Sequence, residues 1–225
     1  DTTDRTSFEG YRTFIGYERN SLNRKQYANK GSKWSLRFGG TNGREETEPG
    51  STAPIKTKLN ERREWISMNF MMNKYFFSKS KFHLGTYVEV NYSELPRFQN
   101  YTVSTLISPA FEPLPENRTI FQSQYRARTF FSAGIKTIYS LRDLIDFRAE
   151  VYLYQPYETL IKNDDGSASY GKEAISRDVI GTFTTVYHSR LGPLAASLNY
   201  YNDAEEEFSF LVHFGYILFN KKGLE

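Results

Sequence analysis

Apolar and polar side chains alternate with a period of two along most of this chain, most clearly in the segment that follows Leu144. Its apolar positions are Ile145, Phe147, Ala149, Val151 and Leu153, and the positions between them include Asp146, Arg148 and Glu150. Successive side chains of a β-strand point to opposite faces of its sheet, whereas a helix would scatter these charges around its circumference. The segment is therefore predicted to be a strand with one apolar face and one charged face.

The same alternation predicts further strands, about nine in all and most of them ~10–15 residues long, whereas ordinary globular strands are usually ~5–6 residues long. They lie at Phe82–Asn91, Gln124–Ile138, Leu194–Tyr200 and Phe208–Leu218, and less clearly at Gly10–Arg19, Ser32–Arg44, Glu64–Phe77 and Asp178–His188. In the strand at Gln124–Ile138 the pattern places Tyr125 and Ala127 on the apolar face.

Short and long connections alternate between these strands. Tight turns are expected at Ser78–Lys81, Ser140–Asp143 and Ser189–Pro193, and long polar connections at Glu45–Arg63, Ser93–Ser123 and Gln155–Arg177. Outer-membrane barrels have this asymmetry, with short periplasmic turns and long extracellular loops. We therefore predict an all-β fold, an antiparallel transmembrane β-barrel with about 8–10 strands in this chain. An odd strand count that starts outside the cell suggests a larger barrel, so we treat residues 1–225 as one β-barrel domain, the C-terminal part of a longer protein.

The composition agrees with this reading and excludes several others. Only 39% of the 225 residues are hydrophobic although 16% are aromatic, which suits strands with one polar face. No run approaches the ~18–20 apolar residues of a transmembrane helix. The chain has no cysteine, which excludes disulfides and thiolate chemistry, and a net charge of +3 is too small to indicate nucleic acid as a partner.

In a barrel that spans a bilayer, the apolar faces meet lipid and the charged faces line the lumen. The predicted lipid-facing side chains are Leu84, Val88, Val90, Ile145, Phe147, Val151, Leu153, Phe210, Val212 and Phe214. The predicted lumen-facing polar side chains are His83, Glu89, Arg126, Arg128, Lys136, Asp146, Arg148 and Glu150. Arg126, Arg128 and Lys136 are expected to oppose the acidic residues across the hairpin. Ion pairs that satisfy one another inside a narrow barrel are favoured over a charged lining that plugs or tunes a small lumen. Aromatic residues near strand ends, including Tyr75, Tyr152 and Tyr154, are expected at the membrane interface.

Three segments resemble a known family. Phe208–Glu225 (FSFLVHFGYILFNKKGLE) resembles the C-terminus of the Bacteroidetes patatin-like phospholipases that carry an outer-membrane barrel, and Ser108–Lys136 and Gly16–Gly31 are similar to the same proteins. Their barrels belong to the surface-antigen and outer-membrane assembly-factor superfamily. The resemblance implies an N-terminal hydrolase domain before the barrel, and a C-terminal insertion signal at His213, Gly215, Tyr216 and Phe219. Assembly factors usually carry an Arg-Gly-aromatic motif on a long loop, and Ser93–Ser123 contains none.

No catalytic machinery is recognised in the chain itself. A patatin-type site needs a Gly-x-Ser-x-Gly elbow, which the sequence lacks, and Asp165-Gly166 is expected to form a turn. His83, His188 and His213 lie on separate predicted strands without ligand spacing, so neither a metal nor another cofactor is expected.

We therefore expect a bacterial outer-membrane barrel that anchors a lipid hydrolase and passes its substrate or product, with no catalysis in this chain. Its expected partners are membrane lipid and, during insertion, the barrel-assembly machinery, and its oligomeric state is left open. Two alternatives remain, a stand-alone porin-like or receptor barrel that binds ligand through its outer loops, and a soluble β-barrel that binds an apolar ligand.

Overall fold

The computed structural model of the chain describes residues 2–51, 56–118, 121–141, 144–171, 177–202 and 206–215. Almost all of the regular structure in these residues is β-sheet. The strands are β1 (Arg5–Asn20), β2 (Ser32–Glu48), β3 (Leu59–Lys79), β4 (Phe82–Ser93), β5 (Ala127–Leu141), β6 (Ile145–Lys162), β7 (Ala168–Tyr170), β8 (Asp178–Ser189), β9 (Gly192–Tyr201) and β10 (Phe208–Phe214). Between β4 and β5 lie a helix, α1 (Tyr101–Ile107), and two 3-10 turns, η1 (Pro115–Arg118) and η2 (Ser123–Tyr125).

The strands form one antiparallel sheet whose order follows the chain, β1-β2-β3-β4-β5-β6-β8-β9-β10. The short β7 pairs only with the end of β6 and extends that hairpin beyond the sheet. Because each strand reverses direction, alternate connections gather at the same end. We call one end the tight-turn end (the connections β1–β2, β3–β4, β5–β6 and β8–β9) and the other the long-connection end. For the described residues, the all-β antiparallel fold and the expected number of about 8–10 strands are confirmed.

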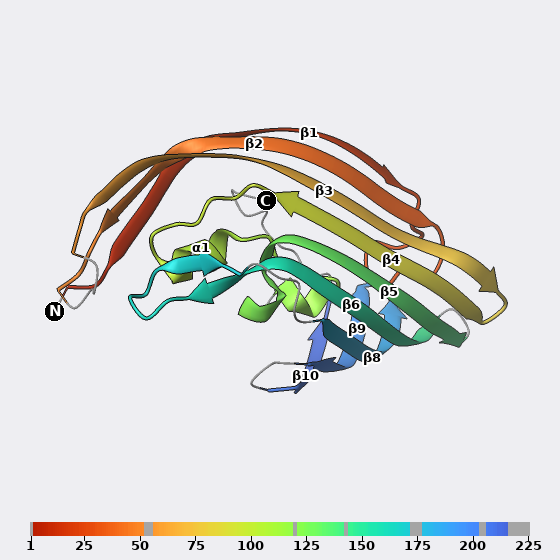
Figure 1. Cartoon of the computed structure of the whole chain (residues 1–225). Coiled ribbons are helices and arrows are strands. Elements are labelled where there is room, and N and C mark those ends of the chain that lie inside the picture. Colours follow the sequence, from red (N-terminus) through yellow and green to blue (C-terminus); the bar gives the residue numbers. More distant parts are fainter. Residues whose placement is uncertain are drawn as a thin grey trace.

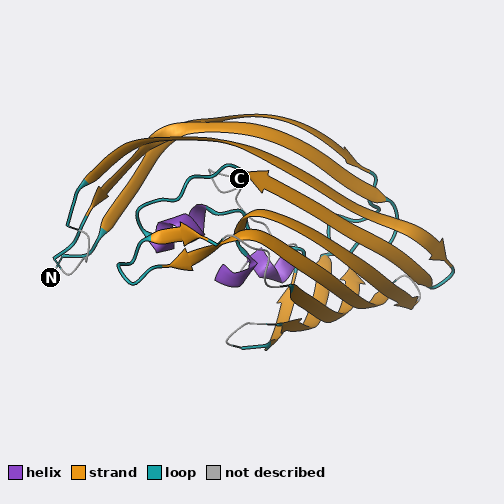
Figure 2. Cartoon of the chain, in the orientation of Figure 1, coloured by secondary structure: helices purple, strands orange, loops and turns teal. Residues whose placement is uncertain are grey.

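The sheet bends into an arch (Figure 1), with β1–β4 over the top and β8–β10 folded beneath. Its concave side holds α1 and the 3-10 turns, as Figure 2 shows. Among the described residues β1 and β10 do not pair with each other, so the sheet is not closed.

Two tyrosine rings lie over glycines on the concave side of the arch. A Cβ added to Gly134 would lie 2.3 Å from Cδ1 of Tyr152, and one added to Gly85 would lie 2.7 Å from Cδ1 of Tyr75. A side chain at either position would therefore force the tyrosine ring of the neighbouring strand, or the strand itself, to shift. These contacts bring the aromatic residues of β3 and β6 down onto the sheet.

The strands extend further than the apolar pattern predicted. The charged stretch expected to be a connection at Glu45–Arg63 continues β2 as far as Glu48 and belongs to β3 from Leu59 onward, and Gln155 begins no loop because β6 runs on to Lys162. Opposite charges face each other beside the β2–β3 extension, with Lys58 Nζ 2.8 Å from Glu48 Oε1. Paired polar strands of this kind need no apolar face, so hydrophobic alternation does not detect them.

The connection between β4 and β5, residues 94–126 (the long connection), is not an extended polar loop. Its helix begins after Asn100, whose Oδ1 accepts a hydrogen bond from Thr102 N at 2.7 Å. Leu95, Phe98 and Phe111 from this connection are each 1% exposed, because they pack against the concave side of the sheet. No helix in the described part of the chain is long and apolar enough to cross a bilayer.

Candidate functional site

Buried charged side chains gather on the concave side of β6 near the tight-turn end. Asp146, Arg148 and Glu150 are 0%, 3% and 6% exposed, whereas Val151 on the convex side is 55% exposed. The alternation seen in the sequence thus separates the two faces of this strand, but the charged face is the covered one. We call Asp146, Arg148, Glu150 and the side chains that contact them the buried polar cluster.

The connection between β1 and β2, residues 21–31 (the inner loop), covers this cluster. Ser21 N donates to Ser32 O at 2.8 Å, which closes the base of the loop. Within it, the side-chain oxygen of Asn23 accepts hydrogen bonds from the backbone N–H groups of Asn29 and Lys30, each at 3.1 Å. Tyr27 has a φ of 53°. These bonds hold the loop in one compact conformation with Tyr27 and Asn29 buried.

Asp146 lies at the edge of the cluster nearest the turns. It accepts hydrogen bonds from Ser140 Oγ at 2.5 Å and from Arg24 Nη1 of the inner loop at 2.9 Å. His188 Nε2 of β8 lies 2.8 Å from Asp146 Oδ2 and 2.9 Å from Arg24 Nη1. A carboxylate without solvent access needs such partners, because an uncompensated buried charge is strongly destabilising. Asp146 therefore ties together β5, β6, β8 and the inner loop.

Arg148 occupies the middle of the cluster. Its Nη1 donates to the backbone carbonyls of Tyr27 and Ala28 at 3.2 and 3.0 Å, and its Nη2 donates to the Tyr75 hydroxyl at 3.1 Å. Glu150 Oε1 accepts from Arg148 Nε at 3.0 Å. The planar guanidinium thereby holds the tip of the inner loop against β3 and β6.

Glu150 completes the cluster on the side toward the long connection. Lys136 of β5 is its register partner, with Nζ 3.7 Å from Oε2, and the Tyr152 hydroxyl also donates to Oε2. The Lys136 ammonium lies over the Tyr87 and Tyr152 rings, 5.5 and 5.6 Å from their centroids. The lysine charge is thus balanced by one carboxylate and two aromatic faces.

Aromatic side chains fill the concave side beyond the cluster. The Phe111 ring of the long connection stacks on Tyr154 at a centroid distance of 5.2 Å and makes an edge contact with Tyr152 at 6.3 Å. Phe130 and Tyr125 each pack against Tyr154. The two inward-folded segments thus fill the concave side from opposite ends, the inner loop over the charges and the long connection over the aromatic rings.

The lumen-facing set predicted from sequence divides between these two regions. The structure brings together Asp146, Arg148, Glu150 and Lys136. Glu89 lies nearby on the same face and accepts a hydrogen bond from the Tyr87 hydroxyl at 2.6 Å. His83 is also buried on the concave face, where its Nδ1 lies 2.6 Å from Ser78 Oγ.

Arg126 and Arg128 do not oppose the acidic residues, and that expectation is wrong. Arg126 precedes β5 and donates to the carbonyls of Leu106 and Ser108 in the long connection, at 3.1 and 3.0 Å. Arg128 pairs with Glu158, near the β7 hairpin. Both arginines lie at the long-connection end because the β5–β6 register places only Lys136 opposite Glu150.

Two other expectations about faces are also wrong. Tyr125 and Ala127 are 1% and 0% exposed, because η2 turns the chain inward just before β5. Tyr75, Tyr152 and Tyr154 are buried on the concave face, not placed at an interface. Pattern reasoning cannot see these contacts, since they depend on where the long connection folds back.

The predicted lipid-facing side chains lie on the convex side. The following are between 36% and 70% exposed: Phe147, Val151, Leu153, Phe210, Val212 and Phe214. Leu84, Val88, Val90 and Ile145 are partly exposed on the same face. In the predicted C-terminal signal, His213 and Gly215 lie at the end of β10, whereas Tyr216 and Phe219 fall outside the described residues.

The partners that complete the cluster were missed at the sequence level. They are Arg24, Tyr27, Ala28, Tyr75, Ser140 and His188. One signal was available for the inner loop: the polar stretch after Asn20 is too long for a tight turn, unlike the other connections at that end.

The geometry of the cluster is that of a fixed network. In a Ser-His-Asp relay the carboxylate holds one imidazole nitrogen while the other faces the serine. Here Ser140 bonds the carboxylate itself, and Nε2 of His188 faces both Asp146 and Arg24. The described residues contain no group of three or more His, Cys, Asp or Glu side chains arranged to hold a metal ion. Asp165 and Gly166 form the expected turn, in which Ser167 N donates to Asp165 Oδ1 at 2.9 Å.

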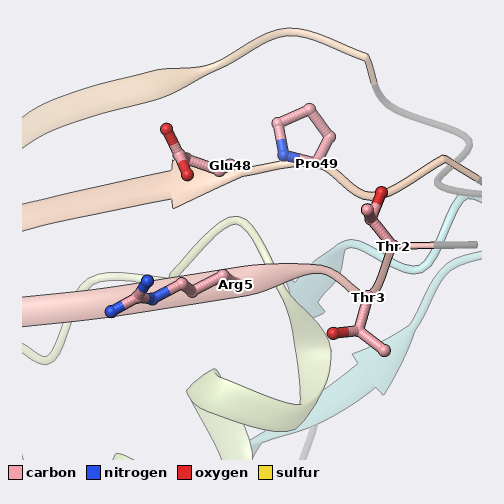
Figure 3. A pocket seen from close by; sticks show the side chains of 5 residues that line it. All are labelled: Thr2, Thr3, Arg5, Glu48 and Pro49. Carbon is pink, nitrogen blue, oxygen red and sulfur yellow. The ribbon is translucent and has the colours of Figure 1, made fainter.

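A surface hollow of about 460 Å³ lies at the long-connection end, away from the cluster. Figure 3 shows its lining on two neighbouring strand ends, Thr2, Thr3, Arg5, Glu48 and Pro49. Glu48 pairs with Lys58 there, so its carboxylate serves the strand extension.

Comparison with known proteins finds no family model, no curated protein and no solved structure that matches this chain.

Proposed function

We propose that this chain forms part of the wall of a bacterial outer-membrane β-barrel, with its convex face in contact with lipid and its concave face plugged. The observation that carries the proposal is the inverted polarity of β6, where Val151 is 55% exposed and its neighbour Glu150 is 6% exposed. A sheet of a water-soluble protein buries its apolar face and exposes its charged one.

The exposed apolar surface continues across the sheet. It includes Tyr11, Ile15, Phe38, Ile66, Ile135, Phe183, Leu198 and Phe210, all at least 46% exposed. Soluble monomers rarely expose contiguous apolar patches of more than a few hundred Å². An apolar surface of this extent is explained by contact with hydrocarbon and is not expected on a sheet that faces water.

The strand lengths suit a bilayer. A transmembrane strand needs ~9–11 residues at a tilt of ~45°. The 15 residues of β5 and the 18 residues of β6 exceed this, so both strands extend beyond a hydrocarbon core. The strands project beyond the hydrocarbon core on the side of the long connections. This projecting part includes the paired charges of the β2–β3 extension and the β6–β7 hairpin.

A membrane wall cannot leave strand edges open, because unpaired backbone groups in hydrocarbon each cost several kcal/mol. The free edges of β1 and β10 must therefore be closed in the bilayer. Side chains of β1 are exposed on both faces, with Tyr11 and Ile15 on one face and Phe14 and Glu18 on the other. This supports closure by additional strands that extend the arch beyond β1, in a barrel larger than this chain provides.

The filled concave face favours an anchor over a wide pore. The inner loop and the long connection occupy it from both ends. We extend the proposal to the anchoring of an N-terminal patatin-like lipid hydrolase, which is supported by the resemblance of Phe208–Glu225 and Ser108–Lys136 to such proteins. A soluble carrier of apolar ligands would need an apolar interior, whereas this one is lined by Asp146, Arg148 and Glu150.

The membrane proposal is tested by fractionation of cells that express the chain and two arginine variants. Val151→Arg places a charge on the convex face, which costs ~2–4 kcal/mol at a bilayer midplane, so less protein should resist carbonate extraction. Leu106→Arg is the matched control, because Leu106 is 53% exposed on α1, away from the convex face. A wild-type chain that stays monodisperse in buffer without detergent would refute the membrane wall. Planar-bilayer conductance separates the anchor from a pore, since a plugged wall should conduct little.

A further inference from the structure

Exposed basic side chains gather at the tight-turn end of the sheet. They are Arg19, Lys25, Lys30, Lys74, Lys79, Lys81 and Arg190, and we call them the basic rim. They come from the first hairpin, from the end of β3 and its turn, and from the β8–β9 turn. The topology places all of these segments at one end of the arch, so residues distant in sequence form one positively charged border.

Few acidic side chains balance this border. At the tight-turn end of the described chain the acidic residues are Glu18, which lies 3.3 Å from Lys33, and the buried Asp146. Within the described residues no side chain of the basic rim takes part in an ion pair. The rim charges therefore remain available to an external anion.

At the long-connection end the exposed charges are mixed in sign. Its exposed cations alternate with exposed carboxylates, and several are paired, as in Lys58–Glu48 and Arg62–Glu64. Glu206 and Glu207 add further acidic charge before β10. The excess of positive charge is thus confined to one end of the arch.

The basic rim directly borders exposed aromatic residues of the convex face. Arg19 is the register partner of Trp34, whose ring makes an edge contact with Tyr17 at 5.7 Å. At the β3–β4 turn, Lys79 is the register partner of Phe82, which packs on Tyr139 at 5.0 Å. Aromatic rings are enriched where hydrocarbon meets headgroups, and adjacent basic residues contact the phosphates there.

We propose that the basic rim recognises anionic phospholipid headgroups and so sets the tight-turn end in a leaflet of negatively charged glycerophospholipid. This inference rests on the proposed membrane wall. A membrane surface fits better than a folded acidic partner, because Arg19, Lys74 and Lys79 lie on the same face as the exposed apolar side chains of β1 to β4. Lys74 lies on the convex face itself, two residues from Met72, where a long side chain reaches the headgroups while its stem stays in hydrocarbon.

Trp34 provides a local probe of the lipid beside the rim. It is 37% exposed on the convex face, whereas Trp65, the other tryptophan, is 8% exposed and packed against Leu95 and Phe98. The chain is purified in detergent and reconstituted into vesicles of one composition, an equal mixture of phosphatidylcholine and phosphatidylglycerol. In one preparation the phosphatidylcholine is brominated, and in the other the phosphatidylglycerol.

We expect brominated phosphatidylglycerol to quench Trp34 fluorescence about twofold more than brominated phosphatidylcholine, because the basic residues beside Trp34 enrich the anionic lipid locally. In the variant with Arg19, Lys30 and Lys74 all changed to Gln, the two lipids should quench equally. The matched control changes Arg44, Lys58 and Arg62 to Gln at the other end of the same hairpins, and should keep the preference. High salt should weaken the preference, since it screens exposed charges.

The outcomes separate this inference from the function on which it rests. Quenching by neither lipid would overturn the membrane wall, and the inference with it. Equal quenching of the wild type by both lipids would leave the wall standing and overturn the basic-rim inference, with an acidic protein surface then the better occupant. A preference that survives in the Arg19, Lys30 and Lys74 variant would also overturn it.

Discussion

Tyr27 and His213 connect the two free edges of the described sheet. Their rings stack with centroids 5.8 Å apart, and the Tyr27 hydroxyl lies 3.1 Å from His213 Nε2. Tyr27 belongs to the inner loop, which follows β1, and His213 belongs to β10. Since β1 and β10 are the free edges of the described sheet, the inner loop spans the opening between them. The loop therefore constrains the curvature of the arch as well as filling it.

Removal of this link should loosen β10. Tyr27→Phe keeps the stacked ring but loses the hydroxyl, which should lower the free energy of unfolding by about 0.5–1.5 kcal/mol. Tyr27→Ala loses the ring too and should cost about 3–5 kcal/mol. Urea unfolding in detergent measures both values. A double-mutant cycle with His213→Ala should show coupling between the two residues, and strict additivity would mean that the link is energetically irrelevant.

Arg148 should be the most sensitive residue of the buried polar cluster. Arg148→Leu leaves Glu150 with fewer compensating partners and frees the carbonyls of Tyr27 and Ala28, so unfolding should become easier by about 3–5 kcal/mol. Arg44→Leu is the control, because Arg44 is exposed on β2, and it should change stability by less than about 0.5 kcal/mol. The stability of the two variants is compared by thermal unfolding, which is monitored by the gel mobility of samples that are loaded without boiling. Equal stability of the two would show that the cluster is dispensable.

The strands and their two faces were predictable from sequence, because alternation has the same period as the strand. On β6 the pattern separates Arg148 from Val151 without any knowledge of neighbours. The partners of these charges were not predictable. Arg24 lies 122 positions before Asp146 in the chain, so their contact depends on the curvature of the whole sheet. The burial of Phe111 is hidden for the same reason, since it lies in a connection that looks polar overall.

The β6–β7 hairpin contains a tyrosine whose ionisation reports on its packing. The Tyr170 hydroxyl donates to Leu95 O at 2.9 Å, and burial raises the pKa of Tyr170 to about 12. In the unfolded chain the pKa of a tyrosine is ~10. Because the folded state binds this proton more tightly, its contribution to stability is complete below pH ~10 and is lost as the pH rises toward ~12.

Absorbance titration of the folded chain in detergent tests this expectation. A difference spectrum between the wild type and Tyr170→Phe isolates one phenol, and its midpoint should lie well above the ~10 of a tyrosine in an unfolded chain. A midpoint near ~10 would show that the β6–β7 hairpin does not pack against the long connection. The stability difference between wild type and Tyr170→Phe should shrink across the same interval of pH.

The contact between Gly134 and Tyr152 gives the sharpest test of packing in the arch. Gly134→Ala would place a methyl group 2.3 Å from the Tyr152 ring, so either the ring or β5 must move. Overpacking of this kind typically costs about 1–3 kcal/mol, and displacement of Tyr152 would also weaken its hydrogen bond to Glu150. Gly40→Ala is the matched control on β2, since nothing lies within 4 Å of a Cβ at Gly40. Urea unfolding should separate the two alanine variants by at least ~1 kcal/mol. If the Gly134→Ala variant were as stable as the Gly40→Ala variant, the ring of Tyr152 could not lie against Gly134. The packing of the aromatic side chains on the concave side would then differ from the one described.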